Sequence, residues 1–462
     1  MTKERSSGLD PVTHFVTNLE LIPSRRYYDP EFFALERERL WPYVWQMACR
    51  LEQIPTVGDY VEYSILGKSL IVVRTKNGVK AFHNACRHRG MQLVTTPGNC
   101  ARRGLTCRFH GWNYNMDGEN KFVFGKHMFS PEVLASAEVN LKPCRVELWA
   151  GCAFINFDDR APSLLESLGP VVERMNARHV DKLKMDWWYA TTLPVNWKLA
   201  MEAFMESYHV MRTHPQLFTA AAATGGSYGP DARGKLLHDN LDARQTINST
   251  IDGLAKVSAG MAGLIHPSEM RVIEKLRDME VPEDPAQAVG ALFMRAMQEI
   301  TKDGLARGAP MFDIAKVSAE FPSKGVEFMF PNFFLLPSFS AMSSYRIRPL
   351  TPESCLFEIW SLVLRPESEA FDTPKQPTVL PYDSTEFPEI PQQDYANLPL
   401  QQLGLHAGGF DFMRLSNSVE GMISNYQRLI DGYLAGRDAE LLVKAAHVVN
   451  SGYDSPILDI GF

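Results

Sequence analysis

Two short stretches, Cys86-Arg87-His88 and Cys107-Arg108-Phe109-His110, dominate the interpretation of this sequence. Each stretch joins one cysteine to one histidine, and 18 residues separate the two pairs. The second pair continues into Gly111-Trp112-Asn113-Tyr114, where the glycine permits close backbone approach and the aromatic rings can shield a bound group. The pattern therefore predicts one metal site built from two loops.

The ligand types favour an iron-sulfur cluster over zinc. A Rieske [2Fe-2S] centre needs two thiolates on one iron and two neutral imidazoles on the other, so each loop supplies one of each. Zinc also accepts two cysteines and two histidines, but zinc modules usually pair like with like at their own spacings. The four predicted cluster ligands are Cys86, His88, Cys107 and His110.

The composition limits the remaining classes of function. The chain has 462 residues, of which 45% are hydrophobic, and this is enough for two cores. A net charge of -7 argues against nucleic acid or an anionic membrane as the main partner. We see no apolar leader behind Met1–Gly8 and no long uninterrupted apolar stretch. Seven cysteines, an odd number at ordinary density, suit a reducing cytoplasm.

The distribution of turn and apolar residues predicts an α+β organisation. Residues 58–157 read as short antiparallel strands, including a hairpin around Gly67-Lys68 and a turn at Lys76-Asn77-Gly78. Asp29 and Pro30 are a typical cap and first position of a helix. Later, strands are expected over 187–193 and 326–364, and helices over 195–211, 254–304 and 419–435. A Pro-rich loop is expected over 366–399.

A second cluster of metal-competent residues lies in the predicted helix 195–211. Glu202, Glu206 and His209 stand at i, i+4 and i+7, which puts them on one face. His214 precedes Pro215, so the helix should end there and let His214 approach His209. Two histidines and one carboxylate are how non-haem Fe(II) is held for O₂ chemistry. Taken alone, the stretch could equally be an amphipathic helix with incidental histidines.

The order of these parts resembles the α subunit of Rieske non-haem iron oxygenases along most of the chain. The resemblance implies a small antiparallel β Rieske domain over 43–158, preceded by a helical segment over 1–42 that packs on the catalytic domain. It implies a catalytic domain over 159–462 with an antiparallel, helix-grip-like sheet flanked by helices. A helical insertion over 217–324 is the part least like the family.

The resemblance also implies cofactors and ligands for the second site. His209 and His214 would bind a mononuclear Fe(II) in addition to the [2Fe-2S] cluster, with O₂ as cosubstrate. The family's third ligand is a distant carboxylate, and Gln393-Asp394-Tyr395-Ala396-Asn397 looks like that segment, so we choose Asp394. The rival carboxylates are Asp372, Asp383 and Asp411.

The family further implies partners and an assembly. Electrons would come from NAD(P)H through a separate flavin or iron-sulfur reductase, directly or by way of a ferredoxin. The expected assembly is a head-to-tail homotrimer, with or without a β subunit. Family members that dihydroxylate arenes generally have Asp at the position of Glu206. In this chain Glu206 would orient His209 and link it to His110 of the partner subunit. This departure leaves monooxygenation and dioxygenation both open.

Five arginines crowd the cluster loops of an acidic protein, namely Arg87, Arg89, Arg102, Arg103 and Arg108. They would either dock an acidic electron donor or form ion pairs at the subunit interface.

The sequence says least about the substrate. A bulky hydrophobic or aromatic compound is preferred, because aromatic residues such as Phe204 and those over 328–336 could line a large apolar pocket. The alternative is a non-aromatic quaternary amine such as carnitine. The loop 220–229 is a candidate pocket wall. Other functions to be weighed are a pure electron-transfer protein and a zinc-stabilised binding protein.

Overall fold

The computed structural model describes residues 11–214, 241–261 and 263–462, so the predicted pocket wall at 220–229 lies outside the described residues. The chain divides into two compact units, one of residues 37–167 and one of residues 1–36 with 168–462. The predicted boundaries were 42/43 and 158/159. Each unit is considered separately below.

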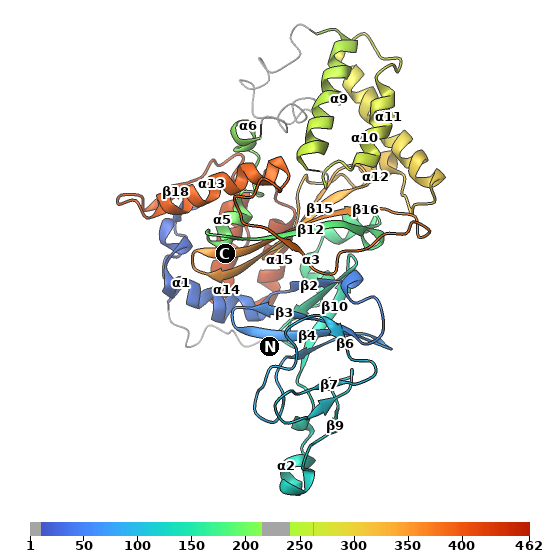
Figure 1. Cartoon of the computed structure of the whole chain (residues 1–462). Coiled ribbons are helices and arrows are strands. Elements are labelled where there is room, and N and C mark those ends of the chain that lie inside the picture. The colour runs from blue at the N-terminus through green and yellow to red at the C-terminus, as the bar shows by residue number, and fades with distance from the viewer. Residues whose placement is uncertain (1–10, 215–240, 262) are drawn as a thin grey trace. The chain divides into compact units, whose positions relative to one another are not determined.

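The smaller unit is an antiparallel β domain. Its main sheet has the order β2-β11-β10-β5-β4-β3-β6, and a second small sheet has the order β7-β8-β9 (Figure 1). The strands are β2 Gln46–Arg50, β3 Asp59–Ile65, β4 Lys68–Thr75, β5 Gly78–His83, β6 Gly98–Asn99, β7 Leu105–Thr106, β8 Asn113–Tyr114, β9 Asn120–Phe122, β10 Pro143–Trp149 and β11 Cys152–Asn156, and the unit adds helix α2 Pro131–Ala135. The hydrophobic core continues from the sheet into the metal loops, because Ile71 and Phe82 share a cluster with Cys86 and Cys107.

The two predicted hairpins of this unit are present. Leu66 and Gly67 connect β3 to β4 with φ of 45° and 81°, so the turn lies one residue earlier than predicted. Left-handed backbone at both turn positions matches the twist of the paired strands, and glycine adopts it without strain. The turn after β4 ends at Gly78, as predicted.

The larger unit is built on a six-stranded sheet of order β13-β14-β15-β16-β12-β17, with β17 parallel to β12 and the other pairs antiparallel. Its strands are β12 Lys184–Leu193, β13 Glu327–Met329, β14 Phe333–Pro337, β15 Met342–Thr351, β16 Ser354–Val363 and β17 Thr378–Val379, and β1 Leu21–Pro23 pairs separately with β18 Phe412–Arg414. The central strands are rich in buried aromatic and β-branched residues, which suit a covered sheet. The predicted α+β fold is confirmed.

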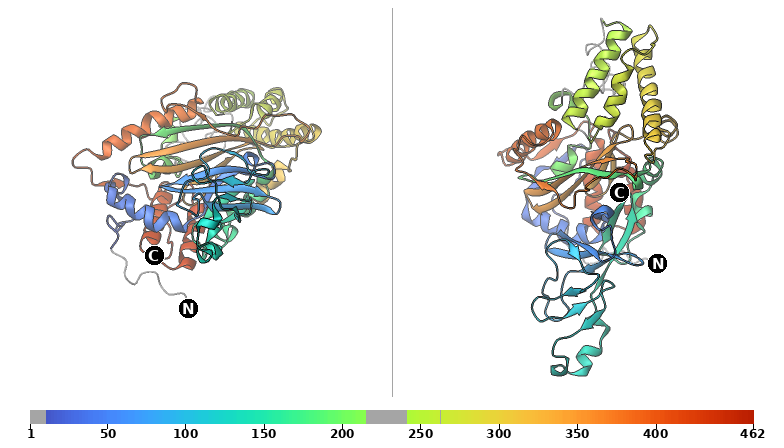
Figure 2. Two further views of the ribbon diagram at one scale, coloured as in Figure 1. Left: turned by 60° about the horizontal axis from the view of Figure 1, so that its bottom comes forward. Right: turned by 45° about the vertical axis from the view of Figure 1, so that its right-hand side comes forward.

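Helices flank this sheet. They are α1 Pro30–Leu35, α4 Val171–Asn176, α5 Trp197–Glu202, α6 Val210–Thr213, α9 Ala243–Gly260, α10 Pro267–Ile273, α11 Pro285–Ala306, α12 Ile314–Glu320, α13 Glu389–Leu405, α14 Gly421–Leu434 and α15 Ala439–Asn450, and α3 Leu164–Leu168 runs across the unit boundary. Helix α5 packs on β15 and β16, whereas α9 packs against α10 and α11 in a separate helical group (Figures 1 and 2). Asp29 caps α1 as predicted, accepting hydrogen bonds from the amides of Glu31 and Phe32.

Helices α13 and α15 differ from what the sequence predicted. The predicted loop 366–399 contains the start of α13, whose buried side chains Ile390, Asp394, Leu398 and Leu405 recur with helical period. Proline is tolerated in the first turn of a helix, so Pro391 does not prevent it, and packing outweighs the cost of Pro399. The predictions also missed α15, which follows α14 after only four residues.

A buried network of ion pairs and hydrogen bonds holds helix α5 in place. Lys198 Nζ lies 2.6 Å from Glu36 Oε1, and both side chains are fully buried. Trp197 Nε1 donates to the other oxygen of Glu36 at 3.1 Å. Arg26 pairs with Asp431 at 2.6 Å in the same interior. Because a buried charge is tolerable only when it is paired and hydrogen-bonded, these contacts fix where α5 lies.

Within the described parts of the chain, no helix combines the length and apolar character that crossing a membrane requires.

We expect Lys198→Met to lower the free energy of unfolding by about 3–5 kcal/mol, because it leaves the Glu36 carboxylate buried without its cation. Denaturant unfolding followed by circular dichroism measures the loss. Lys316→Met is the matched control, since the Lys316–Glu320 pair is exposed at 4.0 Å and should give no measurable change. A Lys198→Met variant as stable as the parent chain would contradict the assigned role of the pair.

Candidate functional site

The two predicted cluster loops share one backbone conformation. The amide of Gly90 donates to the carbonyl of Cys86 at 2.8 Å, and the amide of Gly111 donates to that of Cys107 at 3.0 Å. Both glycines have positive φ, 77° and 69°, which other residues adopt only with strain. A glycine four residues after each cysteine is therefore a sequence signal for these loops.

The two loops bring their cysteines into one buried cluster and their histidine rings into contact. Cys86 and Cys107 are buried, and the ring centroids of His88 and His110 lie 4.6 Å apart. His88 Nδ1 is buried and has no hydrogen-bond partner among the described residues. Buried polar atoms are normally satisfied, so an orphaned imidazole nitrogen in a loop that also carries a buried thiol fits a bound metal cluster. Burial, followed by His110 and Arg89, lowers the pKa of His88, which favours the neutral ligand form.

Aromatic residues surround this group. Trp112 stacks on His88 with centroids 5.2 Å apart. The hydroxyl of Tyr114 lies 3.3 Å from Cys86 Sγ and accepts a hydrogen bond from the Arg87 amide at 2.9 Å. Because one lone pair of the hydroxyl already accepts from the amide, its proton is free to point at the sulfur.

The second candidate site is not on one continuous helix, so the predicted helix 195–211 was wrong. Helix α5 ends at Glu202, and α6 begins only at Val210. Between the two helices, the carboxylate of Glu206 contacts His209 twice. It accepts a hydrogen bond from the His209 backbone amide at 3.0 Å, and its other oxygen lies 2.7 Å from His209 Nδ1. A side chain that bonds locally to the backbone competes with helical hydrogen bonds, which accounts for the break. Helix α6 ends before His214, as predicted.

Glu202 has different hydrogen-bond partners from the other candidates, although it lines the same cavity as Glu206 and His209. The hydroxyl of Tyr27 donates to its two carboxylate oxygens at 2.9 and 3.0 Å, and Gln427 donates to one of them. Burial raises the pKa of Glu202 to about 7, although the bonds from Gln427 and Tyr27 oppose this. Glu202 is thus held by the polar network and not by the histidines.

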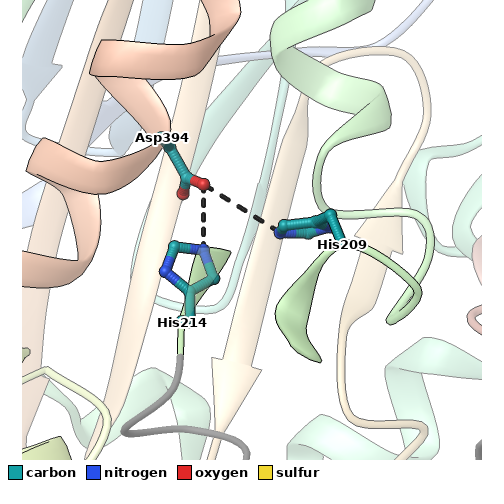
Figure 3. Close-up of side chains that lie close together, drawn as sticks. All are labelled: His209, His214 and Asp394. Atoms are coloured by element: carbon teal, nitrogen blue, oxygen red, sulfur yellow. Dashed lines mark hydrogen bonds and ion pairs between the residues drawn. The ribbon is translucent and has the colours of Figure 1, made fainter. Parts of the chain in front are cut away.

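His209, His214 and Asp394 converge (Figure 3). Asp394 Oδ1, on α13, lies 2.9 Å from His214 Nε2 and 3.9 Å from His209 Nε2. One ligand atom of each residue lies within 4.8 Å of the others. His214 and Asp394 are buried, whereas the His209 side chain is 26% exposed. Two imidazole nitrogens and a carboxylate oxygen facing one point form the donor set of a facial metal triad.

The charges around His209 suit metal binding. Burial lowers the pKa of His209, but the hydrogen bond and charge of Glu206, together with the charge of Asp394, outweigh it and raise the pKa. The carboxylates that raise it, Glu206 and Asp394, would equally favour a metal cation bound at this ring.

A cavity of about 490 Å³ adjoins the triad within the larger unit. It is lined by Leu199, Glu202, Ala203, Glu206, His209, Thr213, Asp394, Asn397, Leu398, Gln401, Phe410, Met413, Arg414, Leu415, Glu420 and Ile423. Carboxylates outnumber the single cationic side chain, Arg414. Burial, and then the charge of Glu206, raises the pKa of Glu420.

Neutral aromatic residues gather near Phe204, which lies in the turn that leads to Glu206. The centroid of its ring is 4.7 Å from that of Phe334 and 4.9 Å from that of Tyr345. Phe334 and Tyr345 are buried core residues, and neither Phe204 nor the predicted run 328–336 is among the residues that line the cavity.

The sequence did not predict one contact of the site. The Oε1 atom of Gln393 lies 2.6 Å from His214 Nδ1. The only available signal was that Gln393 directly precedes Asp394.

Two family models match the chain. The catalytic domain of the ring hydroxylating alpha subunit matches residues 173–436, more than half of the chain, and the Rieske [2Fe-2S] domain matches residues 44–123.

The curated relatives that match this chain are named as subunits of oxygenases. The chain is 33% identical over 212 residues to the α subunit of 2-aminobenzenesulfonate 2,3-dioxygenase from Alcaligenes sp, covering 45% of this chain and 53% of the relative. It is 33% identical over 198 residues to the carnitine monooxygenase oxygenase subunit of Escherichia coli K12, covering 42% and 52%. It is 31% identical over 226 residues to the glycine betaine monooxygenase oxygenase subunit of Chromohalobacter salexigens, covering 48% and 49%. The chain spans about half the length of these relatives.

Solved structures share the fold. Naphthalene 1,2-dioxygenase with bound indole matches with a TM-score of 0.63 at 19% identity, over 93% of this chain and 96% of that one. A quaternary ammonium Rieske monooxygenase with bound L-carnitine matches with a TM-score of 0.55 at 18% identity, over 92% and 99%.

We expect Tyr114→Phe to lower the reduction potential of the cluster, because hydrogen bonds to the sulfur atoms stabilise the reduced, more negative state. Redox titration followed by the Rieske EPR signal measures the shift. Tyr43→Phe, in the same unit but outside the cluster loops, is the matched control and should leave the potential unchanged. Equal potentials for Tyr114→Phe and the parent chain would show that the hydroxyl does not act on the sulfur.

Proposed function

The chain belongs to the family of ring-hydroxylating α subunits, the Rieske non-haem iron oxygenases, and from this premise we propose that it is a terminal oxygenase. It receives single electrons from an NAD(P)H-dependent reductase, directly or through a ferredoxin, and uses O₂ to hydroxylate a small organic substrate. The observation that carries the proposal is the convergence of His209, His214 and Asp394 in a chain that also carries a Rieske domain.

Seven side chains would hold the cofactors. Cys86, Cys107, His88 and His110 would hold the [2Fe-2S] cluster, and His209, His214 and Asp394 would hold Fe(II). When bound, the two groups supply one-electron transfer and O₂ activation. The residues of the chain keep the donor atoms in position: Tyr114 directs its hydroxyl toward Cys86, and Glu206 holds His209 with its Nε2 atom toward Asp394.

A hydrophobic, aromatic substrate is the leading proposal. The apolar side chains of Leu199, Leu398, Phe410, Met413 and Ile423 line the cavity beside the triad, and such surfaces bind apolar compounds. The similarity to 2-aminobenzenesulfonate 2,3-dioxygenase agrees with an arene.

A quaternary amine is the second candidate. Glu206 and Asp394 place carboxylates in the lining of the cavity, and these would attract a cation. The carnitine and glycine betaine monooxygenases among the relatives agree with this choice.

We propose a head-to-tail homotrimer as the working assembly. The acidic cavity of one copy and the arginine-rich cluster loops of the next have complementary charges. Exposed Phe109 and Phe124 beside those loops would add apolar contact. In this arrangement Glu206 links His209 to His110 of the partner subunit. A cytoplasmic location agrees with the seven cysteines, all within the described residues and none in a disulfide.

We expect about three iron atoms and two acid-labile sulfides per chain. We also expect that an arene hydroxylated under isotopically heavy O₂ carries heavy oxygen in its product. A panel of arenes, terpenoids and quaternary amines, analysed by mass spectrometry after turnover with a reductase, measures this. One labelled atom per product, with the second in water, indicates monooxygenation, and two indicate dioxygenation. Turnover confined to the quaternary amines would replace the leading substrate by the second candidate, and a colourless, zinc-containing chain would refute the oxygenase.

We expect mixed oligomers to recover activity lost in each parent. A His110→Ala chain keeps the triad but loses a cluster ligand, and an Asp394→Ala chain has the opposite defect. Random head-to-tail assembly of equal amounts should restore roughly a quarter of the native activity, since one interface in four joins an intact cluster to an intact triad. Mixing His110→Ala with His88→Ala is the matched control and should stay inactive. Activity that stays absent in the first mixture would contradict transfer between subunits.

A further inference from the structure

The two histidines of the triad are held by chemically different partners. His209 Nδ1 faces the carboxylate of Glu206 at 2.7 Å, whereas His214 Nδ1 faces the amide oxygen of Gln393 at 2.6 Å. The Nε2 atoms of both rings are turned toward Asp394 Oδ1. The contact with Gln393 comes from the residue next to Asp394, so one turn of α13 contacts both nitrogens of His214.

The partner at Nδ1 decides which nitrogen of a neutral imidazole is bare. A metal needs the lone pair of His214 Nε2, so the proton must be on Nδ1 and must have an acceptor there. The oxygen of Gln393 is such an acceptor. With the amide reversed, its NH₂ group would donate to a bare Nδ1, and the proton would be on Nε2, where it blocks the metal.

We propose that Gln393 is a positioning residue that keeps His214 in the tautomer with a bare Nε2 and thereby sets the affinity of the triad for its metal. This inference rests on the proposed function, because it assumes that the triad binds a divalent cation. It assigns to Gln393 the task that Glu206 has at His209.

The neutrality of Gln393 has an electrostatic reason. A divalent ion with Asp394 and Glu206 ionised has no net charge, and such balance is what a buried site requires. His214 and Asp394 are both almost fully buried, at 3% and 8% exposed side-chain area. A third carboxylate would give the occupied site a net negative charge and strengthen its hold on the cation, whereas the amide accepts the hydrogen bond without adding charge.

The test measures Fe(II) affinity and not turnover. Holoprotein stripped of mononuclear iron is titrated anaerobically with Fe(II) against a chelator, and its Rieske absorption, which arises in the other unit, reports that each variant is intact. Gln393→Met has similar length but no acceptor, and we expect it to bind Fe(II) about 10–100-fold more weakly. Gln393→Glu has only acceptors, and we expect affinity equal to or higher than that of the parent chain.

Gln298→Met makes the same substitution at an exposed position of α11 and should leave the affinity unchanged. Affinity of Gln393→Met within twofold of the parent chain would overturn the proposal. Equal weakening in Gln393→Met and Gln393→Glu would also overturn it, because the side chain would then act by packing and not as an acceptor. A parent chain that takes up no Fe(II) while its Rieske spectrum is intact would instead refute the proposed function.

Discussion

The contact between Asp394 and His214 is the constraint on which the candidate metal site depends. The two residues are 180 positions apart in the chain, and their side chains meet at 2.9 Å. Such a contact requires that α13 and the segment after α5 both be held rigidly against the central sheet. Helix α5 is held by the buried Lys198–Glu36 pair and by its packing on β15 and β16. The positions of the residues that can bind a metal thus depend on buried contacts that lie outside the triad itself.

Parts of the structure formed by residues close together in the sequence were predicted better than contacts between residues far apart in it. The cluster loops are local, because each Cys, His and Gly lies within five residues, so residue type and spacing were sufficient to predict them. Asp394 could be selected only through a resemblance, since its partners are far away in sequence. Gln393 was missed for the same reason: a glutamine in front of an aspartate carries no pattern of its own.

The errors about helices arose from packing and from side-chain competition. The prolines of α13 suggested a loop, but its buried residues recur with helical period and their burial prevailed. In contrast, residues 203–209 include the helix formers Ala203 and Met205, yet no regular helix continues there, because Glu206 bonds to the His209 amide. Glu202, predicted to share one helix face with Glu206 and His209, belongs instead to the interior network with Tyr27 and Gln427.

The long separation between the ligands also makes the stability of the larger unit depend on its ion. An unfolded chain holds Asp394 far from His209 and His214 on average, so a cation that needs all three would bind only the native state. By mass action such an ion stabilises the fold by RT ln(1 + [ion]/Kd), which is about 2.7 kcal/mol at a free concentration one hundred times Kd. A chain that has lost the ion would therefore unfold more readily than one in which all three side chains hold it.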